Sequence, residues 1–81
     1  MTNINPDNLI KSEPYLIEYC GALMVGFYYG KSIYNEGKKI VFGRMLEPTE
    51  DGVQPTFAKA FITREIKSLT HLKRGEVIKS A

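Results

Sequence analysis

Cysteine, histidine and tryptophan are almost absent from this 81-residue sequence, which contains one cysteine, one histidine and no tryptophan. A single cysteine excludes an internal disulfide framework and is typical of a protein kept in a reducing cytosol. Cys20 and His71 lie far apart, and no clustered metal-ligating residues accompany them, so no zinc site is predicted. We therefore expect a cytoplasmic protein without a cofactor, with Cys20 buried among apolar neighbours and His71 on the surface.

Long uncharged apolar runs are also missing. A membrane-spanning helix needs about 20 apolar residues, and the nearest stretch, residues 15–29, is shorter and contains Glu18. This stretch also lacks the basic start and the small-residue cleavage site of a secretory signal. We expect no membrane association and assign the stretch to the core.

Motifs that carry catalysis are not found either. Neither a GxGxxG nor a Walker-type glycine pattern occurs, so no nucleotide cradle of those kinds is predicted. The adjacent carboxylates Glu50 and Asp51 lie in a predicted turn, where water screens them. A nucleophile pair of Cys20 and His71 needs a reactive thiol, which apolar surroundings disfavour. The sequence therefore predicts a protein that is not an enzyme.

The residues that are present suit a small folded domain. Hydrophobic residues make up 43% of the chain, with five tyrosines and four phenylalanines, which is ample for a compact fold. A chain of this length builds only a thin core, so self-association as a homodimer is expected. We predict a single domain over residues 1–81, with residues 1–5 and 76–81 frayed.

Two apolar segments, residues 40–46 and 57–63, flank the turn sequence Glu50-Asp51-Gly52. β-branched and aromatic residues on both sides of an Asp-Gly step are typical of two strands joined by a turn, because glycine adopts positive φ without a Cβ clash. Pro48 is expected to end the first strand. In the second strand, alternation places Phe57 and Phe61 on the same face.

Residues 15–29 give a mixed signal. Their glycines argue against one long helix, because each costs roughly 1 kcal/mol there. We predict a strand over residues 23–29, in which Gly26 marks a bulge or bend. Residues 15–20 form either a turn of helix or a short strand, and Gly21 breaks the chain between the two segments.

The beginning of the chain has the residues of a helix N-terminus. Asn5 suits the N-cap, Pro6 the first helical position, and Asp7 the positive end of the helix dipole. We expect a short helix over residues 6–11 that ends before Pro14.

The end of the chain is less strongly determined. Residues after Arg64 fit either a short helix closed by Gly75 or, as we favour, a tight turn and a strand over residues 69–73. The predicted fold class is α+β or mainly β. It combines the short N-terminal helix with a four- to five-stranded, strongly bent antiparallel sheet or partial barrel.

The order of residues from Leu23 to Leu72 resembles the small β-barrel of the WYL family. The parallel segments are LMVGFYYGK, GKKIVFGRMLEP, EDG and KAFITREIKSL, which together span about fifty of the 81 residues. The resemblance implies an SH3-like or Sm-like topology. The sequence departs from the family in having no tryptophan, and in carrying Glu65 before Ile66, with Arg64 one place earlier.

Tyrosines and lysines gather around the predicted loop 31–39. Exposed aromatic rings beside cations can stack bases and contact phosphates, so this group is a candidate site for single-stranded nucleic acid or a nucleotide. Of two adjacent strand residues one must point outward, so Tyr28 and Tyr29 cannot both be buried on one face. The candidate residues are Tyr28, Tyr29, Lys31, Tyr34, Lys38 and Lys39.

A second basic group lies in the last third of the chain. Residues 1–30 carry a net charge of −2 and residues 31–81 a net charge of +4, so the later part can attract an anionic partner. Along one sheet edge these side chains would contact phosphates or an acidic protein surface, or would simply discourage edge-to-edge pairing. The residues are Lys59, Arg64, Lys67, Lys73 and Arg74.

Two functions fit these features. The first is a non-catalytic regulatory module that binds nucleic acid or a nucleotide through the tyrosine and lysine loop. The second is a protein-interaction factor, such as a small phage or mobile-element inhibitor, that docks by a strand edge or an apolar face. Their response to salt separates them, because phosphate contacts weaken steeply as salt rises and apolar docking does not.

Overall fold

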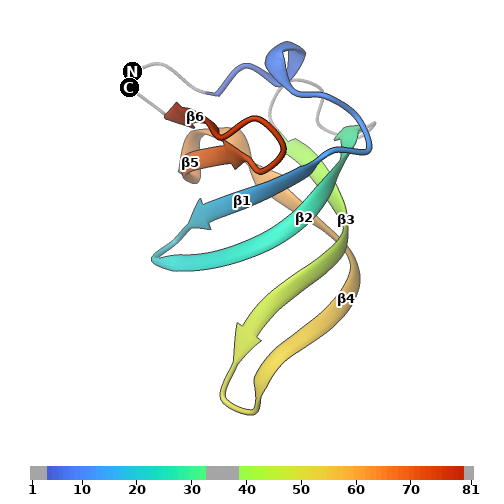
Figure 1. Cartoon of the computed structure of the whole chain (residues 1–81), viewed down its shortest axis with the longest axis vertical. Helices are drawn as coiled ribbons and strands as arrows, with labels where there is room; N and C mark the ends of the chain where they lie inside the picture. The colour runs from blue at the N-terminus through green and yellow to red at the C-terminus, as the bar shows by residue number, and fades with distance from the viewer. Residues whose placement is uncertain (1–3, 33–38, 80–81) are drawn as a thin grey trace.

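The chain folds into one antiparallel sheet, and no α-helix occurs in the part of it that the structure describes (Figure 1). The computed structural model describes residues 4–32 and 39–79. Its strands are β1 (Pro14–Tyr19), β2 (Ala22–Lys31), β3 (Lys39–Thr49), β4 (Gly52–Ile62), β5 (Ile66–His71) and β6 (Glu76–Lys79). They lie in the order β4-β3-β2-β1-β5-β6. The mainly β expectation is confirmed, with six strands instead of four or five. None of the described residues belongs to a helix long and apolar enough to span a bilayer.

One face of the sheet carries the core. Side chains alternate along β2, so that Met24 and Tyr28 are buried while Leu23 and Tyr29 are exposed. We call the buried side the inner face and the opposite side the outer face. The inner-face core consists of Ile4, Leu9, Tyr15, Ile17, Met24, Tyr28, Ile40, Phe42, Met45, Phe61, Ile66 and Leu69.

A two-residue turn at Cys20 and Gly21 joins β1 to β2. Both residues have positive φ, 50° and 78°, as a tight hairpin turn with the right-handed strand twist requires. Residues 15–20 are therefore strand up to Tyr19, which pairs with Ala22. The prediction of a buried Cys20 is wrong, because the thiol lies at an exposed turn.

The predicted bend at Gly26 is confirmed by a register shift between β2 and β3. Val25 pairs with Leu46 and Phe27 with Gly43, so one residue of β2 faces two residues of β3. The single residue of β2 is Gly26, and the two residues of β3 are Arg44 and Met45. Arg44 has a φ of 48°. A Cβ on Gly26 would clash with the side chain of Met45. Gly26 thus lets the side chains of β3 pack closely against β2, and the sheet curls there.

The β3–β4 hairpin continues well beyond the rest of the sheet (Figure 1). Pairing with β2 ends at Leu46, whereas pairing with β4 continues to Thr49. The prediction that Pro48 ends the strand is wrong, because β3 continues to Thr49 and Pro48 pairs with Val53. Only β4 pairs with β3 in this stretch, and a proline, which has no N–H to donate, is tolerated where a strand has one neighbour. We call the hairpin from Arg44 to Phe57 the arm.

The N-terminal segment is shorter and better packed than expected. Asn5 caps it as predicted, since its Oδ1 accepts the Asp7 N–H at 3.0 Å. However, η1 (Pro6–Asn8) is a single 3-10 turn, not a helix to residue 11. Leu9 has extended φ and ψ and is buried, as is Ile4. Burial of these two side chains holds the chain against the sheet. Of the residues 1–5 that were predicted to be frayed, Ile4 is packed in the core and Asn5 caps η1, and residues 1–3 lie outside the described residues.

The C-terminal part forms two short strands after η2 (Thr63–Glu65). The predicted turn and strand are present, but the strand begins at Ile66 and not at residue 69. Gly75, with a φ of 70°, closes the next turn by donating its N–H to the His71 carbonyl at 2.7 Å. Of the residues 76–81 that were predicted to be frayed, 76–79 form β6, which pairs with β5 through Lys79, and residues 80 and 81 lie outside the described residues.

Candidate functional site

The tyrosine and lysine group predicted around residues 31–39 is divided by the fold. Tyr28 is buried on the inner face, and burial raises the pKa of its phenol, so its ring is not available for stacking. Tyr29 is 75% exposed and lies at the second register shift of β2. Lys31 pairs with Asp7 at 3.4 Å, and Lys39 begins β3. Tyr34 and Lys38 lie outside the described residues.

The second basic group does not line one edge. Lys59 lies on the edge strand β4, whereas Lys67 lies on β5, toward the opposite edge of the sheet. Arg64 lies in η2, and Lys73 and Arg74 lie in the turn between β5 and β6. Three of the lysines also have carboxylate partners, in the pairs Lys59–Glu47 at 2.7 Å, Lys67–Glu18 at 3.5 Å and Lys73–Glu13 at 2.8 Å.

The most exposed apolar surface lies on the arm. Phe57 is 98% exposed, and Val53 and Leu46 are 65% and 46% exposed. Residues 47–54 pair only with each other, so no neighbouring strand supports them. An isolated two-stranded ribbon is marginally stable in water. The arm therefore presents large apolar side chains on an element that gains stability from any partner that covers it.

A hollow of about 450 Å³ opens at the base of the arm. Its lining is apolar apart from one guanidinium and one hydroxyl, which is the composition of a site for an apolar side chain rather than for a polyanion. The lining residues are Arg44, Leu46, Pro55, Thr56 and Phe57.

Arg44 stands at the centre of this surface. Its guanidinium carbon lies 4.0 Å from the centroid of the Phe27 ring, a cation–π contact. No carboxylate among residues 4–32 and 39–79 forms an ion pair with it. A second hollow, of about 320 Å³, is lined by Arg44 and Phe57 together with Phe27 and Tyr29. A cation without a carboxylate partner among the described residues thus lies beside the half-buried Phe27 and the exposed Tyr29 and Phe57.

The apolar character of the outer face continues away from the arm. One row of directly opposed residues crosses all six strands, from the edge strand β6 to the edge strand β4. The row is formed by Val77, Thr70, Leu16, Val25, Leu46 and Pro55. No second sheet or helix covers it within the described ranges.

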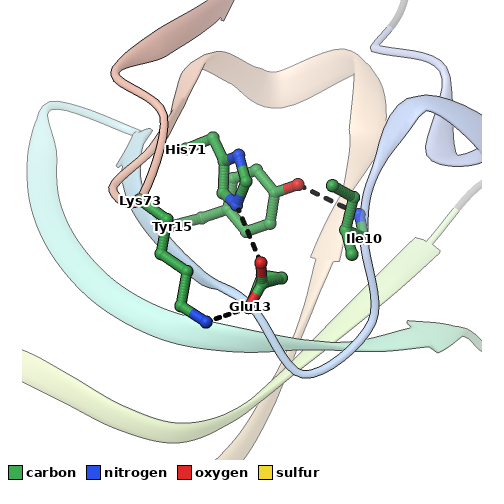
Figure 2. Close-up of polar contacts among 5 residues, drawn as sticks. All are labelled: Ile10, Glu13, Tyr15, His71 and Lys73. Atoms are coloured by element: carbon green, nitrogen blue, oxygen red, sulfur yellow. Dashed lines mark hydrogen bonds and ion pairs between the residues drawn. The ribbon is translucent and has the colours of Figure 1, made fainter.

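A polar cluster on the other side of the molecule joins the start of β1 to the end of β5 (Figure 2). The prediction of a surface His71 is wrong, because its ring is 2% exposed and stacks on Tyr15, with centroids 4.9 Å apart. His71 Nε2 lies 3.6 Å from Glu13 Oε1 and forms no hydrogen bond. The Tyr15 hydroxyl accepts the Ile10 N–H at 3.0 Å.

Electrostatics in this cluster favour a charged Glu13. Lys73 Nζ lies 2.8 Å from Glu13 Oε2, and this hydrogen bond is the largest cause that lowers the pKa of Glu13 below its ordinary value of 4.5. The contacts join the N-terminal segment, β1 and β5, and they bring together no nucleophile with the imidazole. The cluster therefore has the features of a structural tie between segments.

Sequence reasoning missed Arg44 and Phe57. Simple alternation puts Phe57 on the face of Phe61, which is fully buried, yet Phe57 is 98% exposed. The alternation breaks at Arg44, which has positive φ. The β3–β4 pairing passes from Gly43–Ala58 to Met45–Thr56, and Arg44 and Phe57 lie between these pairs. The signal in the sequence is Gly26, because only a residue without a side chain leaves room there for Phe42 and Met45 of β3.

Comparisons of the chain with protein-family models, curated proteins and solved structures find no match. The described residues contain no group of three or more histidine, cysteine or carboxylate side chains placed to hold a metal ion. Its function is therefore inferred from the arrangement of its own residues.

Proposed function

We propose that the chain is a non-catalytic protein-interaction factor, of the kind used as small phage or mobile-element inhibitors, that docks through the outer face of the arm. The observation that carries this proposal is the 98% exposure of Phe57 beside an apolar hollow. Fully burying such a side chain is worth about 1.5–3 kcal/mol. A solvent-exposed phenylalanine at the base of a projecting two-stranded ribbon suits a surface that a partner covers.

The charges favour a protein over a polyanion as that partner. Binding along a phosphate backbone relies on several cations in one groove. Here Lys31, Lys59 and Lys73 are paired with carboxylates of the same chain. Arg44 stands alone among apolar groups, which suits one carboxylate at the rim of an apolar contact.

The test is binding of the purified chain to its partner at high salt, with Phe57→Ser as the variant. Partner capture from the lysate of the native cells should persist at about 500 mM salt, because apolar docking is little screened, and should fall at least about tenfold with Phe57→Ser. The control is Leu72→Ser, which alters a residue 46% exposed in the turn between β5 and β6. Equal capture by both variants would refute the proposal.

A second candidate function is binding of single-stranded nucleic acid or a nucleotide. It is supported by the exposed Tyr29 ring, which lines a hollow together with Arg44 and Phe57, because exposed rings beside a guanidinium can stack bases. Labelled single-stranded RNA and DNA should then shift in mobility at about 50 mM salt, and Tyr29→Ala should remove the shift. No shift at this salt concentration would exclude this function.

Two further features belong to the same proposal. An SH3-like or Sm-like topology of the WYL type is supported by the succession of β2, β3, β4, η2 and β5, with a 3-10 turn before a short strand. A cytoplasmic location is supported by the exposed free thiol of Cys20, which a reducing compartment would preserve.

A further inference from the structure

We propose that the partner that covers the arm is a second copy of this chain, with two arms packed antiparallel, outer face to outer face, about a two-fold axis. The acidic tip of each arm, Glu50 and Asp51, then lies beside Arg44 of the other copy. This inference rests on the proposed docking function of the arm and names its occupant.

The charges on the arm are self-complementary under such a rotation. Arg44 and its neighbour Phe57 stand at the base, and Glu50 and Asp51 form the turn at the tip. Base and tip are separated by six residues along each strand, about 20 Å at ~3.3 Å per residue. A two-fold axis midway along the arm brings each tip onto the other base. One surface thus supplies both halves of two identical ion pairs, as an isologous interface requires.

The surface between base and tip is apolar and free of unpaired cations. It presents Leu46, Val53 and Pro55, of which Val53 is 65% exposed. Lys59, the lysine of β4, is held by Glu47 at 2.7 Å, so it does not leave a bare charge on this element. Two such arms would bury their apolar side chains against each other, as two packed sheets do.

The size of the domain favours a second copy in particular. An 81-residue chain without a disulfide has little core to spare, yet residues 47–54 extend beyond the strands that carry that core. A second arm supplies the support that a two-stranded ribbon needs. Each copy receives this support at the same time.

The test is charge reversal followed by mixing. Arg44→Glu makes both base and tip of the arm negative, and Glu50→Lys with Asp51→Lys makes both positive. Each variant alone should dimerise at least about tenfold more weakly than the natural chain, because like charges then meet twice. An equimolar mixture of the two should regain the natural affinity, since every tip meets a base of opposite sign. Sedimentation velocity at concentrations on the order of 10–500 μM measures all three.

Arg74→Glu and Glu76→Lys are the matched charge-reversal controls, because both residues are exposed and lie away from the arm. They should leave dimerisation unchanged. Far-ultraviolet dichroism checks that each variant is folded. Should Arg44→Glu fail to fold, Arg44→Gln replaces it, and its mixture with the tip variant should associate at least about tenfold more tightly than the tip variant alone.

A natural chain that stays monomeric at the highest concentration would overturn the second-copy proposal, but would leave docking of the arm to another protein intact. A dimer whose mixed variants do not recover would overturn the antiparallel arrangement. Partner capture that is equal for Phe57→Ser and Leu72→Ser would instead refute the proposed function, so the two failures are distinguishable.

Discussion

Phe57 and Phe61 lie four residues apart on β4 and have opposite environments. Phe61 is fully buried against Phe42, with ring centroids 5.6 Å apart, whereas Phe57 is 98% exposed. The kink at Arg44 turns the ribbon between them. One side chain therefore contributes to folding and the other is available for docking.

Truncation of each ring separates these roles. Phe61→Ala should destabilise the fold by about 3–5 kcal/mol through the cavity it leaves. In a solution dilute enough for the chain to be monomeric, Phe57→Ala should change the free energy of unfolding by no more than about 0.5 kcal/mol. Chemical denaturation of the two variants measures both. Similar losses of stability would mean that Phe57 is packed within the single chain.

Gly26 is a position where one added methyl group should lower the stability of the fold. A Cβ there would lie 2.9 Å from the Cβ of Phe42, which cannot move away without shifting its strand. Gly26→Ala should cost about 1–3 kcal/mol, seen as a melting temperature lower by roughly 4–8 °C per kcal/mol. The control is Gly43→Ala, whose new Cβ would lie 3.7 Å from the nearest atom. Equal melting temperatures for the two variants would contradict the close packing of β3 against β2 at Gly26.

Glu13 should give the fold a measurable acid sensitivity. Because the hydrogen bond from Lys73 lowers the pKa of Glu13, the charged form favours the folded state. Its contribution is fully present above the ordinary pKa and is lost as the pH falls through the lowered one. The stability lost in Glu13→Gln, relative to the natural chain, should thus be constant between about pH 6 and 7 and shrink below about pH 4.

Thermal denaturation over this pH range tests the prediction, with Glu50→Gln as the control, since Glu50 lies in the exposed turn of the arm. A difference between Glu13→Gln and the natural chain that persists undiminished at about pH 3 would show that the Lys73 contact does not form.

At the residue scale, strand alternation predicts correctly which side chains of β2 are exposed, but it does not do so elsewhere. It predicts that one of Tyr28 and Tyr29 is exposed, and Tyr29 is. It cannot predict the environments of Cys20 and His71, because these depend on a tight turn and on ring stacking against Tyr15. Local composition does not contain that information.

At the scale of elements, strands were predictable and their lengths were not. The segments around residues 23–29, 40–46 and 57–63 are all strands. Pro48 does not end β3, because only β4 pairs with that stretch. The arm exists because β3 and β4 extend together past the point where β2 ends. That extension is a property of pairing, which propensity alone does not reveal.

Shortening the arm should separate folding from docking at this scale. Replacing residues 48–53 by Asn-Gly keeps Glu47 opposite Gln54 and closes the ribbon with a favoured two-residue turn. Since residues 50–60 are exposed, the melting temperature should change by only a few degrees. Dimerisation and partner capture should both be lost. Sedimentation and thermal denaturation of the shortened chain would show this, and unchanged association would place the contact elsewhere.

At the scale of the whole molecule, the mainly β class follows from the glycine-punctuated apolar segments, but the strand order does not. β1 lies between β2 and β5, so the first and last thirds of the chain meet through pairs such as Ile17 with Leu69. Such long-range pairs decide which charges share a surface. The basic residues that sequence reasoning grouped together are separated for this reason, and Arg44 is left as the cation of the exposed aromatic surface.

The most direct test of the arm as a protein-docking surface is site-specific photocrosslinking in the native cells. A photoreactive phenylalanine analogue at Phe57 should yield one discrete protein adduct on illumination, and the same analogue at Leu72 should yield none. An adduct that contains only nucleic acid, or no adduct at Phe57, would contradict the account.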